Sequence, residues 1–168
     1  MSEKDIIKIV LNELQERNLI KKTESSYKNT ELLLYNYNNI KESISKYREQ
    51  IKDLIENGIP NSSPAVRMIG NSGFKDNSTI LEEQINNLNH TIIRTKNTIR
   101  FINSVLSKIQ TDKYYEIITL KYFQNKTLEE IAEYFECETS TITRNKKRLL
   151  NEIKVLLFPN AFIDELGH

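Results

Sequence analysis

Two long stretches of this sequence carry apolar residues at alternating intervals of four and three. The first stretch has Leu33, Tyr37, Ile40, Ile44, Tyr47, Ile51 and Leu54, and the second has Leu81, Ile85, Leu88, Ile92, Thr95, Ile99, Ile102, Leu106 and Ile109. This heptad rhythm is typical of a coiled-coil seam, and it predicts one helix over about 26–56 and another over about 78–110. Because each seam would be an apolar stripe in water, each must be covered by another helix.

The two predicted helices are joined by a segment rich in turn-forming residues, "NGIPNSSPAVRMIGNSGFKDNS". Gly58 is expected to cap the first helix in the left-handed conformation, and Pro60 prevents its continuation. Short connections favour an antiparallel hairpin within one chain. Pairing of each helix with a second copy of the protein stays open as the alternative. The loop over 57–77 is longer than a hairpin turn needs, and such loops are often functional.

Composition narrows the fold class and the kind of protein. Four Gly and three Pro among 168 residues are too few for an all-β fold, so we expect an all-α chain, with a further helix over about 4–19. No apolar run is long enough to span a membrane, and the acidic N-terminus does not match a signal peptide. We therefore expect a soluble, cytoplasmic protein without a membrane partner.

Candidate catalytic and metal-binding groups are sparse. The single cysteine, Cys137, excludes a disulfide framework and a cysteine-based zinc site, and His90 has no second ligand at metal spacing. There is no Ser-His-Asp set, Gly-rich phosphate loop or inward carboxylate pair. The sequence therefore predicts no enzymatic activity, no cofactor and no metal site.

After Gln110 the pattern changes to short, compact helices. Thr127 is a suitable N-cap and Glu130 lies at the capping-box position, which predicts the start of a helix. A second helix is expected to start at Thr139 or Ser140. Two short helices, a tight turn and a small residue between them are typical of a helix-turn-helix.

The chemistry of this predicted pair favours contact with DNA. Residues 140–154 hold five basic residues and one acidic residue, a net charge of +4, whereas residues 128–138 hold five Glu and no basic residue. Arg144 could read guanine in the major groove, and the later cations could hold phosphates. A surface helix with ordinary Lys and Arg is the plainer interpretation. The candidate DNA-binding residues are Thr127, Thr139, Ser140, Thr141, Thr143, Arg144, Lys146, Lys147 and Arg148.

The segment "YYEIITLKYFQNKTLEEIAEYFECETSTITRNKKRLLNEI" resembles region 4 of sigma-70-type factors. The match covers about a quarter of the chain, and nothing else resembles the sigma regions that melt promoters. A helical hairpin with the loop "SPAVRMIGNSGFKDNSTILEEQI" before such a domain is similar to phage-encoded late-transcription regulators of the ArpU type. The resemblance implies transcriptional control through double-stranded promoter DNA, with RNA polymerase as a further candidate partner.

The turn of the predicted helix-turn-helix departs from the sigma pattern. That family usually has Gly, an apolar residue and Ser, whereas this chain has Glu136, Cys137 and Glu138. Glu136 is therefore expected at positive φ without the freedom of Gly. Glu138 is a poor N-cap, so its side chain must turn away from the DNA or the helix must start later.

We therefore predict an all-α protein with a long antiparallel helical hairpin over 1–110, a sigma-region-4-like helix-turn-helix over 111–158 and a tail over 159–168. The hairpin would mediate self-association through its long helices or contact with polymerase. A DNA-packaging component similar to a small terminase subunit is the alternative. A coiled-coil scaffold whose C-terminal helices bind only protein is a third hypothesis.

Overall fold

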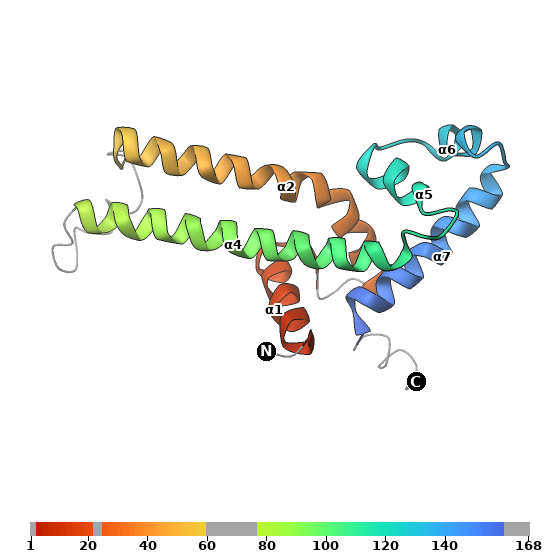
Figure 1. Cartoon of the computed structure of the whole chain (residues 1–168), viewed down its shortest axis with the longest axis horizontal. Helices are drawn as coiled ribbons and strands as arrows, with labels where there is room; N and C mark the ends of the chain where they lie inside the picture. The colour runs from red at the N-terminus through yellow and green to blue at the C-terminus, as the bar shows by residue number, and fades with distance from the viewer. Residues whose placement is uncertain (1–2, 22–24, 60–76, 160–168) are drawn as a thin grey trace. The chain divides into compact units, whose positions relative to one another are not determined.

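The computed structural model of the chain describes residues 3–21, 25–59 and 77–159. Across these ranges the structure is helical and contains no strand, which confirms the predicted all-α class. No helix in them is both long enough and apolar enough to span a membrane. The elements in chain order (Figure 1) are α1 (Glu3–Glu16), α2 (Ser26–Asn57), α4 (Asn77–Ile109), α5 (Glu116–Ile118), the π-helix η2 (Thr119–Phe123), α6 (Leu128–Tyr134) and α7 (Thr139–Leu157).

Each heptad stretch forms one unbroken helix, α2 or α4. α2 ends where the sequence predicted, because Gly58 has a φ of 71° and its N–H donates to the Leu54 carbonyl at 3.0 Å. This is the expected left-handed cap, and nothing lies within 4 Å of the position that a Cβ would take. The conformation alone therefore explains why Gly suits this position.

α1 ends three residues earlier than the predicted range of 4–19. Asn18 has a φ of 54°, and the Leu19 N–H donates to the Leu14 carbonyl at 2.9 Å. This closing bond stops the helix, and Asn tolerates the left-handed conformation better than most residues. The apolar periodicity continues past Asn18, which is why the sequence pattern overestimated the length of α1.

The chain divides into two compact units. The first combines Met1–Asn39 with Asn97–His168, and the second is Ile40–Lys96. The antiparallel hairpin as a whole, and the predicted ranges 1–110, 111–158 and 159–168, stay predictions.

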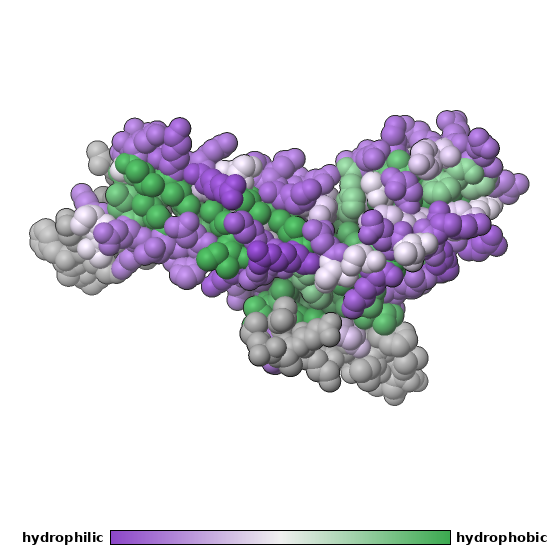
Figure 2. Space-filling view, in the orientation of Figure 1, coloured by the Kyte–Doolittle hydropathy of each residue, from purple (hydrophilic) through white to green (hydrophobic). Residues whose placement is uncertain are grey.

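The second unit contains the later half of α2 and the earlier half of α4. Ile40, Ile80 and Ile92 are buried in it, whereas seam residues such as Ile44 and Leu88 are only half-buried. Figure 2 shows hydrophobic residues reaching the surface between the two helices of this unit. Two helices therefore cover the predicted seam only in part.

The first unit holds a core shared by the N-terminal and C-terminal helices. Tyr37 of α2 donates its hydroxyl to Asn103 of α4 at 2.6 Å, and its ring lies 4.7 Å from that of Phe123 in η2. Asn38 donates its side-chain amide to the Phe123 carbonyl at 2.8 Å. The first half of α2 is thus held against α4 and η2. The fully buried side chains include Leu14, Leu33, Ile102, Ile117, Ile131, Ile142, Leu149 and Ile153.

Candidate nucleic-acid interface

The C-terminal part of the first unit contains two consecutive helices joined by a tight turn. α6 and α7 pack against each other. α5 also contacts α7, and η2 contacts α6. Residues 135–138 make the whole connection. This is the order of elements that a helix-turn-helix has, and its assignment as a DNA-reading motif stays a prediction.

α6 begins with the predicted capping box. The Thr127 side chain accepts from the Glu130 N–H at 3.2 Å, and the Glu130 carboxylate accepts from the Thr127 N–H at 2.7 Å. Lys126 donates to the same carboxylate at 2.9 Å, and this bond, followed by that of the Thr127 N–H, lowers the pKa of Glu130. The Thr127 side chain is therefore already engaged in starting α6.

The turn places a glutamate in the left-handed conformation. Glu136 has a φ of 52°, as the sequence led us to expect. Its N–H donates to the Glu133 carbonyl at 3.1 Å, and the Cys137 N–H donates to the Ala132 carbonyl at 3.0 Å. These two bonds form a Schellman motif, which Gly normally completes. A residue with a Cβ in this conformation costs about 1–2 kcal/mol.

The start of α7 carries an acid. Glu138 is its N-cap and makes no capping bond through its side chain, so the helix starts at Thr139, within the predicted choice. Ser140 instead donates its hydroxyl to the Glu138 carboxylate at 3.1 Å. A carboxylate beside the amide end of a helix occupies the electrostatic position that a phosphate would take. Anion binding is therefore unfavourable at this end of α7.

α7 has one buried face and one exposed face. Its core side is Ile142, Asn145, Leu149, Leu150, Ile153 and Leu157. On the opposite side Ser140, Arg144, Lys147 and Asn151 follow one another at spacings of four, three and four, and all four are exposed. We call these four residues the α7 stripe. Thr143 is exposed beside it, and Thr139 and Thr141 are half-buried.

The four predicted cations of α7 have different surroundings. Lys146 is tied to Glu31 of α2 at 3.3 Å, with the two side chains 19% and 27% exposed. The buried Tyr122 donates its hydroxyl to the same Glu31 carboxylate at 2.7 Å. Burial, followed by this carboxylate, raises the pKa of Tyr122. Lys146 therefore helps to join α7 to α2 and η2.

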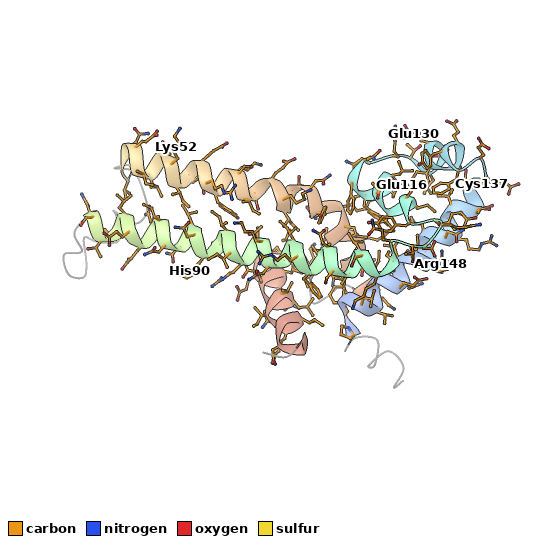
Figure 3. The ribbon with its side chains drawn as sticks, in the orientation of Figure 1. Lys52, His90, Glu116, Glu130, Cys137 and Arg148 are labelled. Atoms are coloured by element: carbon orange, nitrogen blue, oxygen red, sulfur yellow. The ribbon has the colours of Figure 1, made fainter. Side chains whose placement is uncertain are left out.

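Arg148, labelled in Figure 3, is also engaged within the chain. It binds the Asp112 carboxylate with two nitrogens, at 2.8 and 2.9 Å, and Glu152 at 2.8 Å. The bond to Asp112, followed by that to Glu152, raises the pKa of Arg148. In turn, the bond from Arg148 is the main cause of the lowered pKa of Asp112. The pairing fixes α7 to the turn after α4 and leaves Arg148 less available to phosphate.

Arg144 and Lys147 differ from these two. Within the described ranges neither has an ion-pair partner, and both are exposed on the α7 stripe. They also line an open groove of about 840 Å³ whose other wall is the end of α4. Lys108 and Ile109 of α4 form that wall. We call this the α4–α7 groove.

Lys108 is the cation that the sequence reasoning missed. It is exposed in the last turn of α4, and it faces the same groove as Arg144 and Lys147. Nothing local in the sequence marks it, because it is one polar residue beside the seam of a long helix. Only the packing of α7 beside α4 brings it to the stripe. The groove is therefore rimmed by cations from two elements.

In the part of the chain that the structure describes, no group of three or more His, Cys, Asp or Glu side chains could hold a metal ion. Comparison of the chain with protein-family models, with curated proteins and with solved structures finds no match.

Proposed function

We propose that this protein is a sequence-specific DNA-binding transcriptional regulator whose α7 enters the major groove. The observation that carries the proposal is the α7 stripe, which presents Arg144 and Lys147 without ion-pair partners in the described structure. The opposite face of the helix is buried, so the stripe is held on a rigid element. The resemblance of this segment to sigma-70 region 4, and of the chain to ArpU-type phage regulators, supports the same function.

The proposed roles follow from side-chain chemistry. Arg144 donates two hydrogen bonds to guanine, and Asn151 matches the two-bond pattern of adenine. Lys147 and Lys108 hold phosphates, which fix the position of the helix without reading sequence. From Ser140 to Asn151 the helix rises about 16 Å, which is close to the length of five stacked base pairs. A single helix of this length can therefore span one half-site.

The acids of α6 restrict how DNA approaches. Glu129, Glu133, Glu136 and Glu138 are exposed around α6 and the turn, and they would repel phosphates. The duplex therefore meets α7 from the side of Arg144, beyond the first turn of the helix. The same acids lower non-specific affinity, which sharpens discrimination between sites.

The long helices complete the proposal. The half-buried seam in the second unit suits the predicted hairpin arm and its association with a second copy. Two copies would place two recognition helices on one operator, and contact with RNA polymerase would raise its local concentration at a weak promoter.

The test is a salt series of DNA binding by the full chain. A preferred duplex is first selected from a random library, and then wild type is compared with Arg144→Ala, Lys147→Ala and the control Lys52→Ala. Lys52 is an exposed lysine of α2, 3.7 Å from Glu56, and its change removes the same charge. Loss of the Arg144 contact should cost about 1–3 kcal/mol on the preferred duplex and less on competitor DNA.

Lys147→Ala should weaken binding to every duplex and reduce the salt slope by about one. Lys52→Ala should change neither quantity. If all three variants lose affinity equally, or if no duplex is preferred over competitor, α7 is not a sequence-reading helix.

A further inference from the structure

The α4–α7 groove has an apolar floor and a cationic rim. Ile109, Val155 and Leu156 lie among its lining residues, together with Lys108, Arg144 and Lys147. Its acid, Glu152, is already paired with Arg148 at 2.8 Å. Phosphates satisfy the rim but gain nothing from an apolar floor. The groove therefore fits a peptide segment that has apolar residues next to acidic ones.

The chain itself contains such a segment soon after α7. Residues 161–166 read "AFIDEL", in which Phe162 and Ile163 are followed by Asp164 and Glu165. They lie outside the described residues. The apolar pair matches the floor of the groove in chemistry, and the acidic pair matches its rim.

The connection is long enough for this segment to reach the groove. α7 ends at Leu157, and the distance back along the helix to Arg144 is about 20 Å. The eight residues from 158 to 165, which end with the acidic pair, can extend over about 27 Å. A segment that runs back beside α7 could therefore place its acids near Arg144 and Lys147.

We propose that residues 160–168 dock into the α4–α7 groove of their own chain and compete with DNA for Arg144 and Lys147. Phe162 and Ile163 cover Val155 and Leu156, and the acidic pair binds the cationic rim. The docking itself does not depend on the proposed function, whereas the competition rests on it. DNA binding would then require release of the segment.

Docking can be measured in the absence of DNA by tryptophan fluorescence. The wild-type chain contains no Trp, so an introduced Trp reports only on its own position. Phe162→Trp in the full chain supplies a single tryptophan, whose emission should lie at short wavelength and resist quenching by acrylamide. Tyr134→Trp gives the exposed reference, since Tyr134 is 62% exposed on α6. Adding Lys147→Glu to Phe162→Trp should shift the emission toward that reference. Emission as exposed as the reference from the start would overturn the proposal.

A neighbouring groove of about 450 Å³ provides a matched control for position. It is lined by Ile9, Phe101 and Arg100, among others, and it shares Lys108 and Leu156 with the α4–α7 groove. Arg100→Glu should leave the emission of Phe162→Trp unchanged. If Arg100→Glu releases the segment and Lys147→Glu does not, the segment lies in the other groove and the proposal is wrong. A spectrum that changes on dilution would assign the contact to a second copy and would also overturn it.

The competition is tested with Phe162→Ala/Ile163→Ala, which keeps the net charge. If the docked form holds nine-tenths of the molecules, this variant should bind the preferred duplex about tenfold more tightly than wild type. Unchanged affinity, together with fluorescence that shows docking, would refute the competition alone. If no variant binds any duplex selectively, the proposed function fails, while the fluorescence still decides whether the segment docks.

Discussion

The glutamate at positive φ in the α6–α7 turn gives a prediction with a defined sign. Glu136 completes the Schellman motif with a φ of 52°, where a Cβ is unfavourable. Glu136→Gly keeps both backbone hydrogen bonds and removes the Cβ. The substitution should therefore stabilise the protein, although Gly in a helix interior usually destabilises it.

The magnitude follows from two opposing effects. Removing the left-handed strain gains about 1–2 kcal/mol, and the greater backbone entropy of unfolded Gly costs about 0.5–1 kcal/mol. The free energy of unfolding should rise by about 1 kcal/mol, which corresponds to about 2–4 °C in Tm for a chain of this size. Urea unfolding followed by circular dichroism measures the first value, and calorimetry measures the second.

Two matched variants separate strain from charge. Glu133→Gly removes the same side chain three residues earlier, inside α6, and should lower stability by up to about 1 kcal/mol. Glu136→Gln removes the charge but keeps the Cβ, and it should leave stability nearly unchanged. If Glu136→Gly destabilises the protein as much as Glu133→Gly does, the strain argument is wrong.

Two further predictions concern the contacts that hold α7. Tyr122→Phe removes the hydroxyl bonded to Glu31 and should lower the free energy of unfolding, measured in urea, by about 1 kcal/mol. Because the pKa of Tyr122 is raised above 10.0, the same substitution should remove the tyrosine that ionises last in an ultraviolet titration. An unchanged titration would contradict the burial of Tyr122. Arg148 lowers the pKa of Asp112 below 3.8 in the folded state, so this pair stabilises the protein above that pH and the stabilisation is lost as pH falls through the folded pKa. Asp112→Asn should therefore lower stability at pH 6 and flatten its acid dependence, whereas an identical pH profile in both proteins would refute the pairing.

Local signals made part of this structure predictable. The capping box of Thr127 and Glu130 joins residues three apart, and the cap at Gly58 depends on one residue type. The heptad spacing likewise marked α2 and α4, because helical faces repeat with a short period. Even the positive φ of Glu136 followed from comparing its turn with the pattern that the segment resembles.

Long-range pairing made the rest unpredictable. Lys146 and Glu31 are 115 positions apart, and Arg148 and Asp112 are 36 apart. Charge alone ranked Lys146 and Arg148 with Arg144 as surface cations, since no local pattern tells a paired cation from a free one. The role of Lys108 was hidden for the same reason.

The contact of Glu31 with Lys146 and Tyr122 also bears on how the protein is made. A ribosome releases α2 long before α7, so Glu31 has neither of its two partners until most of the chain has been synthesised. During that time Tyr37 and Asn38 of α2, which later contact Phe123, also have no final partner. α2 and α7 would then reach their native arrangement only near the end of synthesis, and shortened products would lack it.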